Sequence, residues 1–201
     1  MDKRAEDLEM TQTRIEDYFP KMKSKLSSFS SIPTLPSPKL PDVSMISPDT
    51  VAALIRGQLS IESFIIIDAR YDYEFQGGHI RGAKNAVDAE SLQDILSNLP
   101  ENNCTALIFH CEFSQHRAPT LYRWLRRVDR ENNLENYPKL TYPSMYVMEG
   151  GYCNFYQEFR DLCEPEGYIP MKHQEFKQER KQHSRKRMGT KGKHSKGLQF
   201  M

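Results

Sequence analysis

The chain has 201 residues, of which 38% are hydrophobic, enough for one domain of ordinary size with flanking tails. Its apolar runs are far shorter than the roughly 20 residues that cross a bilayer, and its first residues are charged where a secretory signal would be apolar. Its 4 cysteines show neither the density of a disulfide framework nor a Cys-x-x-Cys pair for zinc. We therefore expect a soluble intracellular protein with free thiols, no metal and no other cofactor.

Charge is unevenly distributed, although the formal net charge is only +1. The last 30 residues hold 10 of the 28 basic and 2 of the 27 acidic residues, which gives them +8 against −7 for the rest. Residues 177–201 are therefore predicted to form a basic tail. A solvated segment, a nuclear import signal and a substrate-docking extension all fit it, whereas nucleic-acid binding lacks the usual interleaved aromatics. Import through this tail would place the protein in the nucleus as well as the cytoplasm.

Residues 1–42 are rich in charge, serine and proline and show no sustained periodicity, so they are predicted to form a disordered tail. Within this tail, Ile15, Tyr18 and Phe19 have the spacing that places three side chains on one side of a helical turn. With Gln12 they resemble the sliding-clamp binding box, in which these four positions are the anchors. A chance amphipathic turn explains the pattern equally well.

Residues 43–176 alternate predicted strands and helices, as expected for one α/β domain. The expected elements are, in order, a helix over Thr50–Ile55, a strand over Phe64–Ile67, a helix over Glu90–Leu99, a strand over Thr105–Phe109, a helix from Pro119 to about Glu131, a strand over Met145–Met148 and a helix over Asn154–Leu162. Such alternation implies a central, mainly parallel sheet with right-handed crossovers and helices on both faces.

The central motif of the sequence is a strand that ends at Cys111, followed by five residues and then Arg117. Parallel sheets place such residues at their carboxyl edge, and the helix that follows begins at the loop. The loop amides, the helix N-terminus and the Arg117 guanidinium would converge on one point that suits a tetrahedral dianion. The same field stabilises a thiolate, so Cys111 becomes a candidate nucleophile for phosphoryl transfer. An inert buried cysteine is the alternative that this short pattern leaves open.

A second motif follows the first predicted strand and has Asp68, Arg70, Glu74-Phe75 and then Gly78-His79-Ile80-Arg81-Gly82-Ala83-Lys84-Asn85. It resembles the strand-to-loop signature of the rhodanese fold. Its glycines permit tight turns, and Arg70 and Glu74 are candidates for a buried ion pair. His79 is expected to be a hydrogen-bonded structural residue.

Further segments narrow the resemblance. They are His110-Cys111-Glu112-Phe113-Ser114, Arg117-x-Pro119, Tyr137-Pro138-x-Leu140, Gly150-Gly151-Tyr152, Cys163-Glu164-Pro165, Tyr168-x-Pro170-Met171 and Phe176-Lys177. In order and spacing, over roughly residues 42–178, they are similar to the M-phase inducer dual-specificity phosphatases with a rhodanese-like catalytic domain. The joint match is specific, although no single segment is.

This resemblance implies that Cys111 attacks phosphothreonine and phosphotyrosine to form a cysteinyl-phosphate, with Arg117 as phosphate clamp and Glu112 as candidate acid. It implies that the substrate is a cyclin-dependent kinase–cyclin complex, whose dephosphorylation promotes entry into M phase. The implied phosphate-binding loop comprises Glu112, Phe113, Ser114, Gln115, His116 and Arg117. The implied loop supports are His110, Asp68 and Arg70, and the implied docking residues are Arg126, Arg130 and Tyr137.

Three positions depart from the family pattern. His116 replaces the usual glutamate, which leaves Glu112 or a group on the substrate as the proton donor. Ala118 replaces a glycine and would strain the loop if its φ had to be positive. Ala69 replaces the cysteine that usually protects the nucleophile as a disulfide, so oxidation of Cys111 is expected to be less readily reversed unless Cys104 or Cys153 substitutes.

Other functions remain open from the sequence. A sulfurtransferase of the same fold usually has one residue fewer in its loop, and an arsenate reductase has no need of the segment from Tyr137 to Phe176. A weakly active adaptor that binds a kinase or the clamp would explain His116 and Ala118 as decay, but Cys111 and Arg117 are retained.

Overall fold

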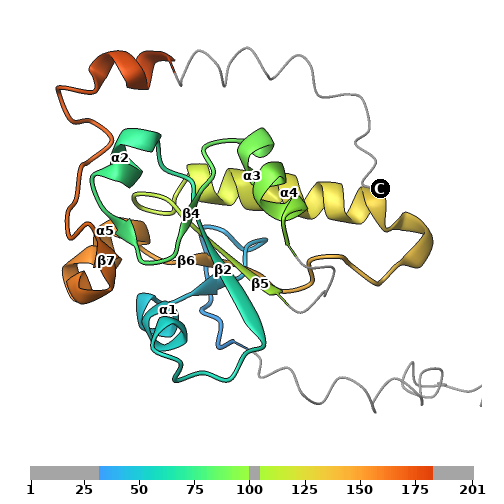
Figure 1. Cartoon of the computed structure of the whole chain (residues 1–201). Coiled ribbons are helices and arrows are strands. Elements are labelled where there is room, and N and C mark those ends of the chain that lie inside the picture. Colours follow the sequence, from blue (N-terminus) through green and yellow to red (C-terminus); the bar gives the residue numbers. More distant parts are fainter. Residues whose placement is uncertain (1–31, 100–104, 183–201) are drawn as a thin grey trace, which may run out of the picture. The chain divides into compact units, whose positions relative to one another are not determined.

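The computed structural model describes residues 32–99 and 105–182 (Figure 1). The elements in chain order are β1 (Met45–Ile46), α1 (Pro48–Ile55), β2 (Ser63–Asp68), α2 (Asp72–Gln76), β3 (His79–Ile80), β4 (Lys84–Asn85), α3 (Ala89–Ser97), β5 (Thr105–His110), α4 (Arg117–Asn132), η3 (Leu134–Asn136), β6 (Met145–Met148), α5 (Gly151–Glu158), η4 (Arg160–Leu162) and β7 (Cys163–Glu164). The two η elements are single 3-10 turns.

A five-stranded sheet in the order β1-β6-β5-β2-β4 forms the centre of the domain, and all of its neighbouring strands are parallel. A separate two-stranded antiparallel sheet joins β3 to β7. β2 and β5 pair along their full length, with Asp68 opposite His110 at the carboxyl edge. The predicted α/β fold with a mainly parallel sheet is confirmed.

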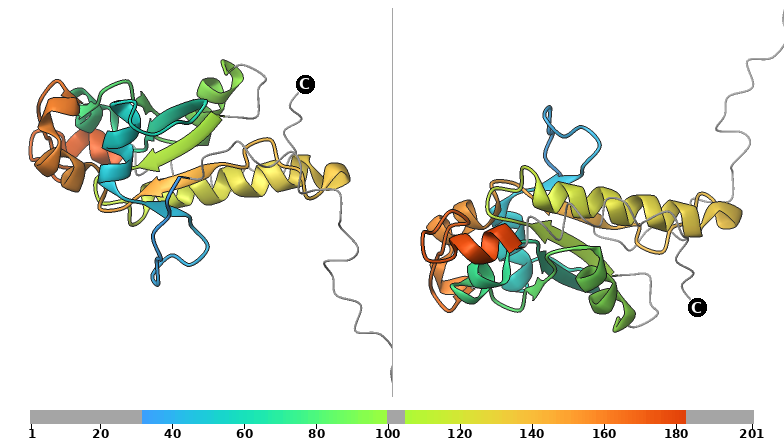
Figure 2. Two further views of the ribbon diagram at one scale, coloured as in Figure 1. Left: turned by 90° about the horizontal axis from the view of Figure 1, so that it is seen from below. Right: turned by 90° about the horizontal axis from the view of Figure 1, so that it is seen from above.

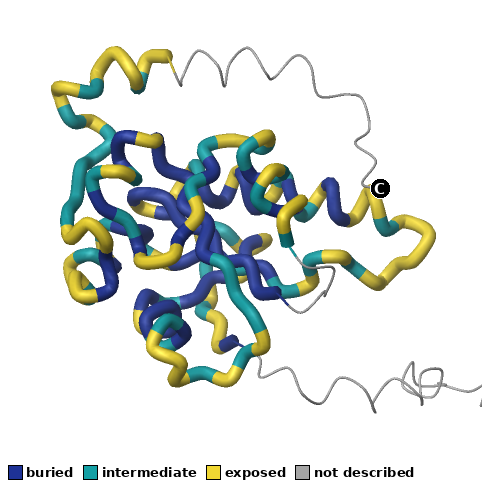
Figure 3. The backbone as a smooth tube through the Cα atoms, viewed as in Figure 1, coloured by how far each residue is buried: buried dark blue, intermediate teal, exposed yellow. Residues whose placement is uncertain are grey.

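The sheet is buried on both faces, because residues along β5 alternate between two hydrophobic clusters. Leu107 and Phe109 lie in the cluster formed with α3 and α4. Ala106 and Ile108 lie in the cluster formed with α1 and α5. Figure 2 shows α4 running along one side of the sheet, and Figure 3 shows the central strands as the most buried part of the domain. Burial on both faces explains why β5 is a continuous apolar run.

The fold extends beyond the bounds of 43 and 176 that composition suggested. Ile32 is buried, and the Leu35 N–H donates to the Met45 carbonyl over 2.8 Å. Residues 177–182 are helical, next to Phe176, which stacks on Tyr73. Isolated apolar residues among prolines and charges make these contacts, and average composition does not reveal them. The sliding-clamp box at residues 12–19 lies outside the described residues.

Two helices near the site begin earlier than predicted. α4 begins at Arg117 rather than Pro119, so the proline occupies the first turn, where its missing N–H costs nothing. The predicted helix over Asn154–Leu162 is α5 from Gly151, followed by the separate 3-10 turn. Gly150 caps α5 in a left-handed conformation that sequence periodicity does not register.

Candidate active site

The loop that follows β5 carries the candidate nucleophile. Cys111 is 3% exposed, and the loop runs from it through residues 112–116 to Arg117, the first residue of α4. The hydrogen bonds of the described residues include none donated by the N–H groups of residues 112–116 to another protein group. Ser114 has a φ of 53°, and its buried hydroxyl likewise has no protein partner. The loop thus combines a thiol, several available donors and a guanidinium, as the sequence predicts.

The N-terminus of α5 packs against this loop. The Tyr152 N–H donates to the Cys111 carbonyl over 2.8 Å, and the Cys153 N–H donates to the Glu112 carbonyl over 3.0 Å. Gly151 has a φ of 65°, and a Cβ atom there would lie 2.4 Å from the Cys111 carbonyl oxygen. Glycine is therefore required for the close approach of the two backbones. The sequence indicated the turn but not its contact with the loop.

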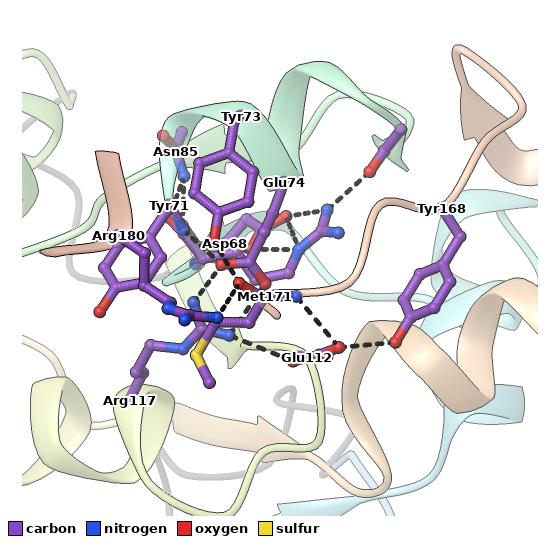
Figure 4. A network of polar contacts seen from close by, with 12 residues as sticks. Asp68, Tyr71, Tyr73, Glu74, Asn85, Glu112, Arg117, Tyr168, Met171 and Arg180 are labelled. Atoms are coloured by element: carbon purple, nitrogen blue, oxygen red, sulfur yellow. Dashed lines mark hydrogen bonds and ion pairs between the residues drawn. The ribbon is translucent and has the colours of Figure 1, made fainter. Parts of the chain in front are cut away.

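Arg117 is fixed by Glu74 of α2 (Figure 4). Its Nη2 donates to Glu74 Oε1 over 3.0 Å and its Nη1 to Oε2, a bidentate arrangement. Burial alone would lower the pKa of Arg117, but the hydrogen bonds and negative charge of Glu74 outweigh it and raise the pKa. The guanidinium therefore stays charged and keeps its orientation.

The ion pair predicted between Arg70 and Glu74 is replaced by two others. Glu74 pairs with Arg117, and Arg70 pairs with Asp68, with 3.0 Å from Arg70 Nε to Asp68 Oδ1 and 2.6 Å from Nη2 to Oδ2. Sequence spacing could not distinguish these partners. Asp68 is the last residue of β2 and lies opposite His110 at the edge of the sheet. In the turn that follows, the Arg70 N–H also donates to Asp68 Oδ1.

A fully buried polar cluster of Asp68, Arg70 and His110 lies at the base of the loop. Arg70 also donates from Nη2 to the Gly78 carbonyl over 2.7 Å, and its guanidinium lies 3.8 Å from the centre of the Tyr152 ring. Burial alone would raise the pKa of Asp68, but the charge and the hydrogen bonds of Arg70 hold it below its ordinary value. Burial lowers the pKa of His110 to about 4, so its imidazole is neutral near pH 7. The three predicted support residues are thus together.

Glu112 is buried, and its carboxylate is held from three sides (Figure 4). Its Oε1 accepts hydrogen bonds from the Tyr168 hydroxyl over 2.7 Å and from the Met171 N–H over 3.3 Å. Its Oε2 lies 3.8 Å from Arg117 Nη2. The roles of Glu74, Tyr168 and Met171 were not predicted. Tyr168 and Met171 lie in the segment Tyr168-x-Pro170-Met171, which contributes to the family resemblance but to which no role was assigned from the sequence.

The three departures from the family pattern have different consequences. Ala118 lies in the first turn of α4 and is fully buried, and its φ is not positive, so the predicted strain is absent. His116 is exposed and caps α4 without a side-chain hydrogen bond to the backbone. Ala69 is 2% exposed, and its N–H donates to the His110 carbonyl. Cys153 is a half-buried free thiol, and Cys104 lies outside the described residues.

Of the predicted docking residues, Arg126 and Arg130 lie in the half of α4 away from the loop, and Tyr137 follows η3 beyond the helix. Arg126 uses its guanidinium within the domain, because Nη1 donates to the Tyr142 carbonyl over 2.8 Å and also lies 3.3 Å from the Asp129 carboxylate. Arg130 is exposed, and Tyr137 is 78% exposed. Only the last two present their side chains to solvent, and a docking role stays a prediction.

Residues 32–99 and 105–182 contain no cluster of three or more His, Cys, Asp or Glu side chains arranged to hold a metal ion. None of their helices has both the length and the apolar character needed to span a bilayer.

The parallel sheet, with a cysteine and an arginine at the two ends of one loop on its carboxyl edge, defines a domain of the rhodanese type. The model of the rhodanese-like domain family matches residues 47–158, more than half of the chain. The chain therefore belongs to the rhodanese-like domain family.

Within this family, the predicted similarity to M-phase inducer phosphatases is confirmed. The chain is 42% identical to M-phase inducer phosphatase 3 of Bos taurus over 182 residues, 86% of this chain and 37% of the relative. It is 42% identical to the Homo sapiens protein of the same name over 163 residues, 77% of this chain and 34% of the relative. The chain thus spans about a third of these curated relatives.

A solved structure is similar in fold. Saccharomyces cerevisiae Ygr203w, described as a homolog of single-domain rhodanese and of the Cdc25 phosphatase catalytic domain, superposes with a TM-score of 0.51 at 22% identity. The match covers 68% of this chain and 95% of that one. At this level of identity the likeness concerns the fold alone.

Proposed function

We propose that the protein is a cysteine-dependent dual-specificity phosphatase that acts through a cysteinyl-phosphate. The observation that carries this proposal is the loop from Cys111 to Arg117, in which a buried thiol and a guanidinium clamped by Glu74 lie at the two ends of a run of available amides. This arrangement suits a phosphoryl group with three equatorial oxygens. The similarity to proteins named M-phase inducer phosphatases supports the same reaction.

In the first step, the Cys111 thiolate attacks phosphorus, an S–P bond forms and the bond to the leaving oxygen breaks. Arg117 and the loop amides stabilise the charge on the equatorial oxygens. Because Glu74 holds the guanidinium on two sides, little reorganisation is needed when this charge moves.

In the second step, water attacks the cysteinyl-phosphate, the S–P bond breaks and the electron pair returns to sulfur. We assign the proton of this water to Glu112, because two donors hold its Oε1 and keep its Oε2 3.8 Å from Arg117 Nη2, beside the proposed phosphate site. Glu112 then releases the proton to solvent. The proton that the leaving group needs in the first step comes in this scheme from the substrate side.

The proposed substrate is the phosphothreonine and phosphotyrosine pair of a cyclin-dependent kinase in complex with its cyclin, and the outcome is entry into M phase. Phe113, Gln115 and His116 project from the loop into solvent, which supports a site that a folded protein can reach. Arg130, near the end of α4, and Tyr137, beyond that helix, are exposed and available for docking away from the loop. Their separation from the loop suits a large substrate rather than a small phosphate ester.

The assay compares the full-length protein and Cys111→Ser on a doubly phosphorylated kinase–cyclin complex, with release of inorganic phosphate as the measurement. We expect phosphate release by the wild type and none by the variant. Sulfur transfer from thiosulfate to cyanide and reduction of arsenate are measured in parallel. Failure to release phosphate in a Cys111-dependent way would refute the proposal, and a Cys111-dependent signal in either parallel assay would identify the alternative reaction.

Two further proposals rest on sequence alone. The basic tail at 177–201 is proposed to direct nuclear import, and Gln12, Ile15, Tyr18 and Phe19 to bind a sliding clamp. Deleting the tail should shift a fluorescent fusion toward the cytoplasm. Replacing Tyr18 and Phe19 by alanine should abolish binding of the purified clamp in a titration, with replacement of the neighbouring Glu16 as the control.

A further inference from the structure

The match to the rhodanese-like family ends at residue 158, but the site also includes a segment that follows it. Residues 167–180, here called the C-terminal strap, cross the edge of the loop that carries Glu112 (Figure 4). Within the strap, the Tyr168 hydroxyl and the Met171 N–H are the two donors to Glu112 Oε1. The rhodanese-like core alone therefore leaves this carboxylate without these two hydrogen bonds.

The strap is anchored at points that do not involve Glu112. The Tyr152 hydroxyl donates to the Gly167 carbonyl over 2.8 Å, immediately before Tyr168. A Cβ atom on Gly78 would lie 2.0 Å from the same carbonyl oxygen, so the strap packs directly on the backbone of the turn before β3. The Tyr168 ring also stacks with Tyr152 at 6.0 Å between ring centres. These contacts fix the position from which the Tyr168 hydroxyl reaches Glu112.

A second anchor joins the strap to α2. The Tyr73 hydroxyl donates to the Met171 carbonyl over 2.6 Å, and the Tyr73 ring stacks on Phe176 with 4.6 Å between centres and 7° between planes. Burial raises the pKa of Tyr73 to about 12, so its hydroxyl remains a donor at neutral pH. The same short helix thus supports Arg117 through Glu74 and supports Met171 through Tyr73.

We infer that Tyr168 is a positioning residue for the second step of the reaction, holding the Glu112 carboxylate as a proton acceptor beside Arg117. This inference rests on the proposed phosphatase function. The 2.7 Å hydrogen bond occupies Oε1 and leaves Oε2 turned toward Arg117, the residue proposed to hold the phosphoryl group that the water attacks. Tyr168 itself does not need to touch the substrate. Without the Tyr168 hydroxyl, Glu112 keeps the longer bond from Met171 and the 3.8 Å contact with Arg117, which hold its carboxylate less firmly.

The inference predicts a defect in one step only. In Tyr168→Phe the ring stack is retained and only the hydroxyl is lost. With p-nitrophenyl phosphate as probe, the burst of p-nitrophenol from the first step should keep its rate. Steady-state release of phosphate should fall about 10-fold, the scale of a hydrogen bond to a charged group, and phosphoenzyme should accumulate in acid-quenched samples.

The matched control is Tyr156→Phe, because the Tyr156 ring also stacks on Tyr168 at 6.0 Å but its hydroxyl has no bond to Glu112. It should leave both rates unchanged. Glu112→Gln should show the same phosphoenzyme accumulation, and Tyr168→Phe combined with Glu112→Gln should be no slower than Glu112→Gln alone, because the two residues act through one contact. Melting temperatures of all variants identify any loss of fold.

The possible outcomes distinguish the positioning role of Tyr168 from the proposed phosphatase function. If the wild type releases phosphate but Tyr168→Phe slows both steps equally, or adds its full effect to that of Glu112→Gln, the positioning role is overturned while the phosphatase function stands. If the wild type itself releases no Cys111-dependent phosphate, the proposed function is overturned, and the inference falls with it.

Discussion

At the scale of single residues, the base of the site consists of polar side chains that the fold has removed from water. Asp68, Arg70 and His110 are fully buried, and Arg70 compensates the charge of Asp68 directly. His110 has no hydrogen-bond partner on either ring nitrogen within the described residues. A neutral imidazole tolerates such a place far better than a charged one.

This environment makes stability depend on pH. The pKa of His110 falls from its ordinary 6.5 to about 4 on folding, because burial disfavours the charged ring. The unfolded chain therefore binds more protons in this range, and stability that is fully present above pH 6.5 is lost as the pH falls toward 4. We expect a slope of up to about 1.4 kcal/mol per pH unit for this one group in urea unfolding experiments.

The non-titrating variant His110→Asn provides the control. It should be less stable than the wild type near neutrality, but its unfolding free energy should vary less between pH 6.5 and 4. Parallel pH profiles for the two proteins would show that other groups cause the dependence.

At the scale of elements, backbone contacts between loops and helices determine the geometry of the site more than the secondary-structure propensities of single residues do. One of these is the close approach of Gly151 to the Cys111 carbonyl, at the start of α5. Gly57 has nearly the same φ, 67° against 65°, but a Cβ atom there would meet nothing within 4 Å. A side chain at Gly57 would therefore be strained only by the positive φ, whereas one at Gly151 would also clash with the Cys111 carbonyl.

We expect Gly57→Ala to cost only the conformational term, about 1–2 kcal/mol. Gly151→Ala should cost clearly more and should also weaken the binding of tungstate, a phosphate mimic, because the loop must move away from α5. Chemical unfolding and calorimetric titration measure the two effects. Equal losses in both variants, with tungstate affinity intact, would argue against a role for this contact.

The sequence predicted much of this arrangement, for identifiable reasons. Strands β2, β5 and β6 are short, mostly apolar runs, Cys111 directly follows β5, and Arg117 comes after five further residues. Side-chain partners that are far apart along the chain could not be predicted, because residue spacing in a sequence indicates only contacts within one helix, strand or turn. Glu74 and Arg117 are 43 positions apart, and Tyr168 and Glu112 are 56 apart. The conformation of Ala118 was also missed, because it depends on where α4 begins.

At the scale of the whole molecule, the folded domain extends beyond the residues of the family match. The match begins at residue 47, after β1, and ends at residue 158, before β7 and the C-terminal strap. Ile46, in the edge strand β1, is fully buried, and Ile32 is 6% exposed. The polypeptide on either side of the match thus completes one of the hydrophobic clusters.

A chain cut to residues 47–158 should therefore be much less stable than the full-length protein. Loss of Ile46 alone removes a fully buried side chain, which costs about 2–5 kcal/mol in comparable cases. Limited proteolysis and urea unfolding of the two purified chains measure the difference. Equal resistance and equal midpoints would show that the flanking segments are dispensable for stability.

The contact between α5 and the loop also sets the direction of peptide planes. In a trans peptide the carbonyl and the following N–H point to opposite sides. Because α5 binds the carbonyls of Cys111 and Glu112, the N–H groups of residues 112 and 113 are turned away from α5. The dipoles offered to an anion are thus oriented before it arrives, by a helix whose side chains need not touch it. Changes in the first turn of α5 should then alter selectivity among oxyanions while every residue of the loop stays the same.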